Sequence, residues 1–143
     1  MTGAMTDGHL GVGQNTGILT SFTSLTGNWD NVVWGGGTHT FALSSGTQNK
    51  WFATGRNADG QLGLGDKTQR TRFTALTGSW DKVCPGDFIT IALSAGTGSK
   101  WYGTGLNQGM PGIVGSQTSF TPLTGNWYNI NLGDSSMFAF SAV

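Results

Sequence analysis

An eight-residue phrase that occurs three times decides the fold of this chain. It reads Phe22-Thr23-Ser24-Leu25-Thr26-Gly27-Asn28-Trp29, then Phe73-Thr74-Ala75-Leu76-Thr77-Gly78-Ser79-Trp80, then Phe120-Thr121-Pro122-Leu123-Thr124-Gly125-Asn126-Trp127. The tryptophans that end the copies lie about fifty residues apart, a period typical of propellers and other repeat architectures. Three such octets at nearly constant spacing do not arise by chance, so the chain is built from tandem repeats.

Three further phrases recur in step with the first. An apolar phrase follows each tryptophan, as Thr40-Phe41-Ala42-Leu43-Ser44, Thr90-Ile91-Ala92-Leu93-Ser94 and Met137-Phe138-Ala139-Phe140-Ser141. A tryptophan phrase covers residues 50–55 and 100–105, and a glycine-rich phrase covers residues 8–13 and 60–65. Each repeat therefore holds four short strand candidates separated by turn residues. Four strands in about fifty residues is the size of one propeller blade.

The sequence predicts an all-β fold with about three four-stranded antiparallel propeller blades, forming a partial propeller or one completed by oligomerisation. We expect a single repeat domain over residues 1–143 that divides into a partial blade (1–28), two blades (29–79 and 80–126) and a second partial blade (127–143). Strands are expected near 29–34, 39–44, 50–54, 80–84, 89–94, 100–104, 127–132 and 136–142, with weaker strands near 21–25, 72–76 and 119–123. Helix should stay under about 10%. Trp80 and Leu93 are expected to be buried.

The composition supports this fold and limits the classes of partner that we expect. The chain has 143 residues, 25 of them glycine, a net charge of zero, and charged residues at only 10%. Abundant glycine with threonine and serine favours short strands and tight turns, while the aromatic residues provide a core that a disordered linker would lack. Nothing indicates a membrane or nucleic acid as partner. Cys84 is the only cysteine, so no internal disulfide can form, which fits a reducing compartment.

Two segments carry a family resemblance. They are Gly36-Gly37-Thr38-His39-Thr40-Phe41-Ala42-Leu43 and Gly55-Arg56-Asn57-Ala58-Asp59-Gly60-Gln61-Leu62-Gly63-Leu64-Gly65. They resemble blades of the regulator-of-chromosome-condensation family of β-propellers, in a divergent version similar to repeats of bacterial and phage proteins. The resemblance implies a structural role for His39. Some members of that family stimulate nucleotide exchange on a small GTPase, which needs a complete ring of about seven blades.

Candidate interaction residues fall into two groups. Arg56, Lys67, Arg70 and Arg72 concentrate positive charge in one loop. They indicate either an anionic partner or a solvated loop with Asp59 and Asp66 as counter-charges. Trp34 has no tryptophan counterpart in the other repeats, where Pro85 and Leu132 align with it, so Trp34 is the better candidate for a contact surface. The residues expected to pack the blades are Trp29, His39, Trp51, Trp80, Trp101 and Trp127.

No catalytic, cofactor or metal pattern stands out. The glycine-rich phrase at residues 60–65 is not followed by the helix that a phosphate-binding loop needs. The oxygen ligands around Asp59 do not have the spacing of a calcium loop. His9 and His39 lack the activated nucleophile of a catalytic triad. The sequence therefore predicts a protein that is not an enzyme and uses no cofactor.

The function hypotheses are those of a structural or interaction protein. We expect a bacteriophage virion component, either a head decoration or a tail adhesion protein; a scaffold in the bacterial cytoplasm and a GTPase exchange regulator are alternatives. The expected partners are copies of the chain itself and other structural proteins. The chain begins at the end of a third strand and ends after a second strand, so we expect subunits to complete one another's blades; the alternative is that a different protein of the assembly covers both open edges.

Overall fold

The computed structural model describes residues 3–4, 6–47, 49–107, 109–132 and 137–141. It confirms the all-β fold, since the chain forms two four-stranded sheets and two two-stranded ones, all with antiparallel neighbours. The first large sheet has the order β3-β4-β5-β6 and comprises Trp29–Gly35, His39–Ser44, Trp51–Gly55 and Arg70–Ala75. The second has the order β10-β9-β8-β7 and comprises, from β7 to β10, Trp80–Pro85, Ile89–Ser94, Trp101–Gly105 and Gln117–Pro122.

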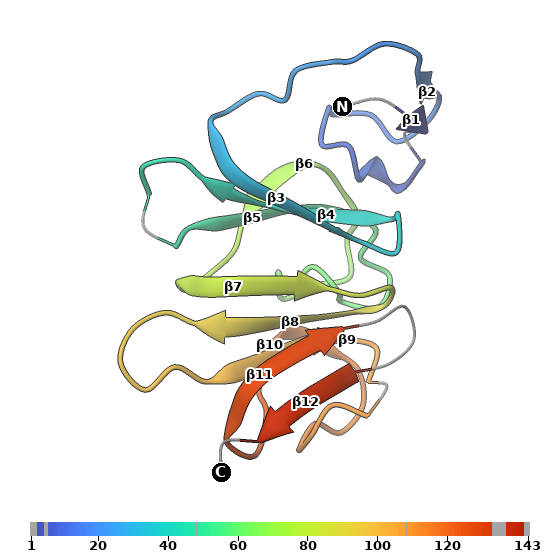
Figure 1. Cartoon of the computed structure of the whole chain (residues 1–143). Coiled ribbons are helices and arrows are strands. Elements are labelled where there is room, and N and C mark those ends of the chain that lie inside the picture. The colour runs from blue at the N-terminus through green and yellow to red at the C-terminus, as the bar shows by residue number, and fades with distance from the viewer. Residues whose placement is uncertain (1–2, 5, 48, 108, 133–136, 142–143) are drawn as a thin grey trace.

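The two small sheets lie at opposite ends of the stack (Figure 1). β1 (Gly3–Ala4) pairs with β2 (Ile18–Leu19) near the N-terminus, and β11 (Trp127–Leu132) pairs with β12 (Met137–Ser141) near the C-terminus. The helical structure of the described residues is one short 3₁₀ segment, η1 (Thr6–Gly8). The sheets are stacked in chain order, so each large sheet packs against its neighbours in the sequence.

Most strands lie where the repeat predicts them, but one prediction is wrong. The strands expected at 39–44, 89–94 and 127–132 have those bounds, and most others are shifted by one or two residues. The strand expected near 21–25 is absent, and the neighbouring strand is β2 at Ile18–Leu19. Among the described residues, β2 pairs with the two residues of β1. Residues 136 and 142, the ends of the last expected strand, lie outside the described part of the chain.

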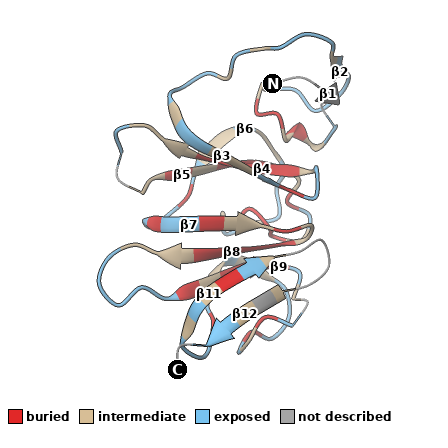
Figure 2. Cartoon of the chain, viewed as in Figure 1, coloured by how far each residue is buried: buried red, intermediate tan, exposed pale blue. Residues whose placement is uncertain are grey.

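The hydrophobic core lies between the sheets in two clusters, and the buried segments in Figure 2 mark these contacts. The first joins the two large sheets and contains Phe41, Trp51, Ala53, Leu62, Leu76, Trp80, Val83 and Ala92. The second joins the second large sheet to β11 and contains Ile89, Ile91, Trp101, Met110, Ile113, Leu123 and Ile130. Both clusters therefore extend across a junction between successive sheets.

The burial prediction holds for Trp80 and fails for Leu93. Trp80 is 7% exposed, whereas Leu93 is half-buried and only flanks the second cluster. Leu93 lies near the end of β8, just before the turn that leads to β9. Leu43, at the same position in β4, is half-buried as well. The position is peripheral in both blades, which a repeat alignment alone does not reveal.

The repeated tryptophans make the same contacts in successive blades. Trp29 packs against Phe73 with ring centroids 4.9 Å apart, and Trp80 packs against Phe120 at 4.7 Å. Tryptophans of the third strands connect the blades: Trp51 Nε1 donates to the Trp80 carbonyl at 2.9 Å, and Trp101 Nε1 donates to the Trp127 carbonyl at 3.2 Å. One set thus packs within a blade, while the other fixes each blade to the next.

The glycine-rich loop of the first large sheet lies on the outer strand of the second. Leu64 forms a β-bridge with Ser119, and the Gly65 amide donates to the Thr118 carbonyl at 2.8 Å. A Cβ atom on Gly60 would come within 2.4 Å of the Gln117 carbonyl oxygen. Glycine at this position is therefore required for close approach between blades.

Candidate functional site

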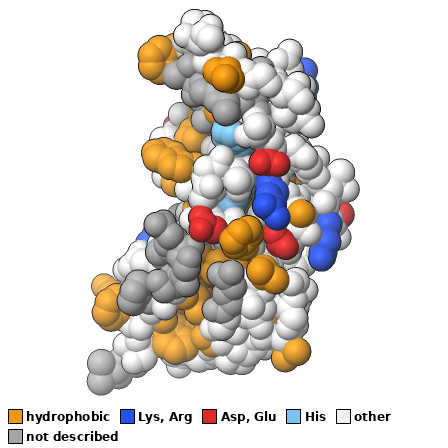
Figure 3. All heavy atoms as spheres, turned by 90° about the vertical axis from the view of Figure 1, so that its right-hand side faces the viewer, with side chains coloured by type: hydrophobic (Ala, Val, Ile, Leu, Met, Phe, Trp, Pro, Cys, Tyr) orange, Lys and Arg blue, Asp and Glu red, His pale blue; other side chains and the backbone are white. Residues whose placement is uncertain are grey.

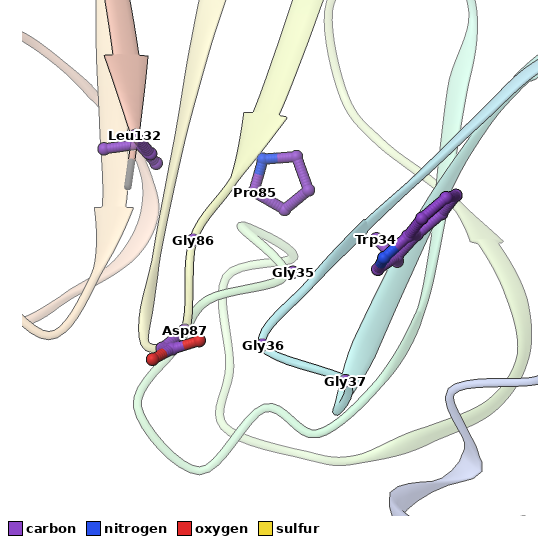
Figure 4. Close-up of a pocket in the computed structure, with 8 residues that line it drawn as sticks. All are labelled: Trp34, Gly35, Gly36, Gly37, Pro85, Gly86, Asp87 and Leu132. Carbon is purple, nitrogen blue, oxygen red and sulfur yellow. The ribbon is translucent and has the colours of Figure 1, made fainter. Parts of the chain in front are cut away.

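The first strands of three successive sheets form one edge of the stack, and their ends carry the candidate site. Trp34 on β3, Pro85 on β7 and Leu132 on β11 occupy the same position in their hairpins, since each is paired with the residue at the matching position of the second strand. Figure 4 shows Pro85 between Trp34 and Leu132. The alignment of Trp34 with Pro85 and Leu132 therefore describes one continuous row across three blades.

This row borders a hollow of about 390 Å³ that is completed by the hairpin turns. The turns lie very close together, because a Cβ atom on Gly35 would come within 2.2 Å of the Gly86 carbonyl oxygen. Glycine at position 35 lets this turn lie against the next one. We call the depression beside the turns the axial hollow. Its lining is Trp34, Gly35, Gly36, Gly37, Pro85, Gly86, Asp87 and Leu132.

The axial hollow combines a large apolar side chain with a carboxylate. Trp34 is 72% exposed at its rim, and Asp87 lies on the opposite turn (Figure 4). Exposed tryptophan in a rigid setting is a frequent anchor of protein interfaces. Asp87 can accept hydrogen bonds from a cationic or amide group. Sequence reasoning identified Trp34 but missed Asp87, which lies in a turn whose sequence is not repeated.

The basic residues named from the sequence do not share this site. Arg70 and Arg72 lie on β6, at the opposite edge of the first large sheet from Trp34 on β3. Two of the four cations are paired: Arg70 Nη2 lies 2.7 Å from Asp66 Oδ2, and Arg56 Nη2 lies 3.3 Å from Asp59 Oδ2. Figure 3 likewise shows basic side chains next to acidic ones on this face.

Local contacts account for much of the charge in the basic loop. The Arg70 side chain, followed by the Thr68 amide, lowers the pKa of Asp66 from its ordinary value. Arg56 also lies over the Phe88 ring, 5.4 Å from its centroid. Lys67 and Arg72 are exposed. The solvated-loop interpretation fits this arrangement better than a single anion-binding patch does.

His39 is buried and uncharged at neutral pH. Burial, followed by the charges of Arg56 and His9, lowers the pKa of His39 to about 4. Its Nδ1 atom lies 3.3 Å from Thr38 Oγ1, and its buried Nε2 atom has no hydrogen-bond partner among the described residues. A neutral, enclosed imidazole with no nucleophile beside it fits a packing role.

Other chemistry-bearing groups do not assemble into a reactive site. Burial raises the pKa of the half-buried Cys84 thiol, which favours the unreactive protonated form. Within the described ranges, no group of three or more His, Cys, Asp or Glu side chains could hold a metal ion. Over the same part of the chain, the structure contains no helix with the length and apolarity needed to span a membrane.

Comparison with solved structures identifies the fold. No known family model matches the sequence, and neither does any curated protein. Human WBSCR16 aligns with a TM-score of 0.66 at 19% identity, over 84% of this chain and 32% of that one. Prp20p of Saccharomyces cerevisiae aligns with a TM-score of 0.61 at 18% identity, over 80% of this chain and 31% of that one. The fold is that of RCC1-type β-propeller blades.

The RCC1-type neighbours are longer proteins. In its complex with Kap60, yeast RCC1 (Prp20) aligns with a TM-score of 0.62 at 16% identity, over 89% of this chain and 32% of that one. The chain thus spans about a third of the length of these structures. Prp20p was characterised with its binding to Gsp1p and histones. The likeness establishes the RCC1-type fold and leaves the partners of this chain to be inferred from its own surface.

Proposed function

We propose that this chain is a protein-interaction module without catalytic activity, and that it binds a partner protein through the axial hollow. The observation that carries the proposal is Trp34, which is 72% exposed at a position where the other blades have smaller side chains. A large exposed apolar side chain beside a rigid depression is typical of interface hot spots. The RCC1-type neighbour Prp20p, whose structures were described with its binding to Gsp1p and histones and in complex with Kap60, supports a role in protein interaction.

The partner should present an apolar side chain together with a hydrogen-bond donor. The apolar group would pack on Trp34, Pro85 and Leu132, while the donor would reach Asp87. Burying a tryptophan at the centre of an interface contributes strongly to affinity. Exposed Lys67, outside the axial hollow, is not expected to contribute.

Affinity capture with matched variants tests the axial hollow. Immobilised wild-type chain, Trp34→Ala and Lys67→Ala would be exposed to the same extract, and bound proteins identified by mass spectrometry. We expect a protein retained by wild type and Lys67→Ala to be reduced at least about tenfold by Trp34→Ala, as for a hot-spot residue. An identical set of proteins captured by all three chains would contradict the proposed binding site.

The finer proposal is that this module belongs to a bacteriophage particle, as a head decoration or tail adhesion protein. Its support is the sequence: a low-charge, glycine-rich chain with one cysteine and divergent repeats that resemble those of phage proteins. Mass spectrometry of purified virions should find many copies of the chain. Its absence from virions, with recovery from the bacterial cytoplasm, would favour the scaffold alternative.

A further inference from the structure

The carboxylate of Asp87 lies directly against the hairpin turn that follows Trp34. A Cβ atom on Gly36 would come within 2.3 Å of Asp87 Oδ1, and Gly36 stands two residues after Trp34. Two residues of chain span at most about 7 Å. The negative charge of the second blade therefore lies close to the backbone of the residue that carries the exposed indole of the first blade. Figure 4 shows both side chains at the axial hollow.

The charge of Asp87 has no counter-charge in the described part of the chain. Among those residues, neither ion pair includes Asp87, and no hydrogen bond reaches its carboxylate. Arg56 lies over the ring of Phe88, the residue after Asp87, but its guanidinium pairs with Asp59. Asp87 is half-buried, so its carboxylate oxygens are available at the hollow to accept hydrogen bonds from a cation.

The chain already holds one arginine with the same two kinds of group. The Arg56 guanidinium carbon lies 5.4 Å from the centroid of the Phe88 ring, and its Nη2 atom lies 3.3 Å from Asp59 Oδ2. The axial hollow likewise presents an aromatic ring on Trp34 and a carboxylate on Asp87. Indole attracts a cation more strongly than a phenyl ring does. The pair at the hollow is thus a second arrangement of the kind that holds Arg56.

The backbone amides of the two turns do not favour an anionic ligand. The Gly86 amide donates to the Ile89 carbonyl at 2.8 Å, and the Thr38 amide donates to the Gly35 carbonyl at 3.1 Å. These two donors are therefore used within their own turns. Together with the charge of Asp87, this arrangement selects a ligand that donates hydrogen bonds and carries positive charge.

We propose that the axial hollow binds an arginine side chain of the partner protein. The inference rests on the proposed function and names the one residue type that supplies both groups expected there. The guanidinium plane stacks on the Trp34 indole while its N–H groups donate to the Asp87 carboxylate. The methylene stem of the arginine packs on Pro85 and Leu132.

Arginine fits this site better than lysine or a folded segment. The hollow of about 390 Å³ is at the low end of ligand-binding pockets, which suits a single side chain. A planar guanidinium can stack on a ring and donate from its edge at the same time, whereas the lysine ammonium is a compact, strongly hydrated charge. The site should therefore distinguish the two cations.

Titration of the ¹⁵N-labelled full chain with short peptides tests the inference by NMR. The probe is a blocked pentapeptide with arginine between glycines, and its control carries citrulline, which keeps the shape of arginine and lacks the charge. The reporter is the Trp34 indole N–H signal, assigned by its loss in Trp34→Ala. We expect a saturable shift with a dissociation constant in the millimolar range for arginine, and binding at least about tenfold weaker for citrulline.

Substitution of the carboxylate provides the matched pair of variants. Asp87→Asn should weaken binding of the arginine peptide about tenfold and remove the preference over citrulline, because the charge that it pairs with is gone. Asp81→Asn changes an exposed carboxylate at the other end of β7 and should leave the arginine affinity unchanged. Backbone amide spectra that match wild type away from the substituted turns would show that both variants fold.

Two results would overturn the arginine inference. The first is equal affinity of the wild-type chain for the arginine and citrulline peptides. The second is an unchanged preference for arginine in Asp87→Asn, which would place the binding site elsewhere.

The capture experiment separates this inference from the proposed function. A partner protein that is lost with Trp34→Ala and retained in full by Asp87→Asn would overturn the arginine inference and support the proposed binding site. A selective response to the arginine peptide, with no difference in capture between wild type and Trp34→Ala, would support the arginine site and contradict the proposed function.

Discussion

The two glycine-rich loops of the molecule share a backbone pattern but differ in burial. In the first loop the Gly63 amide donates to the Gly60 carbonyl at 3.0 Å, and in the second the Ile113 amide donates to the Met110 carbonyl at 3.2 Å. Leu64 of the first loop is half-buried against the first core cluster, whereas Val114 at the matching position is 91% exposed. The difference is the outer strand of the following blade, which β10 provides only for the first loop.

The comparison shows that these blades are stabilised mainly by their neighbours. Local hydrogen bonds shape both loops, and Met110 and Ile113 of the second loop are buried in the second core cluster. The residue that reaches toward the next blade, in contrast, is half-buried as Leu64 and exposed as Val114. Trp80 and Trp127 differ in the same way: both indoles donate to a nearby threonine carbonyl, but Trp80 is buried and Trp127 is half-buried. The predictions below measure this difference, starting with the largest effect.

Alanine substitutions at the two equivalent tryptophans should show the largest difference in stability between the complete second blade and the C-terminal pair β11–β12. Trp80→Ala should lower the free energy of unfolding by about 4 kcal/mol, within the range for buried aromatic residues. Trp127→Ala should cost about half as much, because less of its surface is removed from solvent. Urea denaturation of the two variants at a concentration where the chain is monomeric provides the measurement. Equal losses would contradict the comparison.

Alanine substitutions at glycine positions of the two loops should show which loop is in close contact with a neighbouring strand. Gly60→Ala should lower the free energy of unfolding by about 3 kcal/mol, since it adds a clash with the Gln117 carbonyl to the cost of positive φ. Gly109 also has positive φ, but a Cβ atom there would meet nothing within 4 Å. Gly109→Ala should therefore cost only about 1–2 kcal/mol. Thermal and urea unfolding of the pair check this ranking.

His39 should make the first large sheet sensitive to acid in a way that the second is not, since Ile89 begins the matching strand β8. The folded-state pKa of about 4 lies below the ordinary histidine value of 6.5, so the unfolded chain binds the additional proton. The contribution is present above pH 6.5 and is lost as pH falls toward 4. Between pH 7 and pH 5 the free energy of unfolding should fall by about 2 kcal/mol from this residue.

The control for the acid effect is His39→Ile, which gives the first blade the residue of the second. Its free energy of unfolding should vary with pH by about 2 kcal/mol less than that of wild type over the same range. A pH dependence unchanged in His39→Ile would show that other groups cause the acid sensitivity.

The smallest predicted effect concerns the threonines that hold the loops. The Thr104 hydroxyl lies 2.8 Å from the Gly60 carbonyl oxygen and 3.0 Å from that of Gln117. Thr104→Val should lower the free energy of unfolding by about 1 kcal/mol, because the Gly60 and Gln117 carbonyls lose the single hydroxyl donor that they share. Thr54→Val removes the corresponding contact to Gly8, and should mainly speed hydrogen exchange in residues 6–13. Hydrogen-exchange mass spectrometry would distinguish the local effect from the global one.

Much of the fold could be predicted from the sequence because the repeat aligns equivalent strands. The strand at 39–44 predicts the one at 89–94, and turn residues mark the limits of both. The missing strand at 21–25 could not be predicted this way, since its phrase is the same as those that form β6 and β10. The repeated phrase therefore does not by itself decide whether a strand forms.

The candidate site was predicted only in part. Trp34 was identifiable because it interrupts the repeat, but its neighbour Asp87 was not, because the two residues are brought together by close packing of glycine turns from different blades. The ion pairs of Arg56 and Arg70 could be anticipated from acidic residues three or four positions away. That Trp34 and the basic loop lie at opposite edges of one sheet follows from the strand order.

The sequence by itself determined the repeat period, the strand positions and the all-β class, because strand and turn preferences act over a few residues and recur in each copy. The tertiary structure decided which copies of a residue are buried. Phe73 and Phe22 stand in the same phrase, yet Phe73 packs on Trp29 and Phe22 is 88% exposed. Burial of a blade residue depends on strands about fifty positions away, and contacts at that distance are set by packing rather than by local sequence.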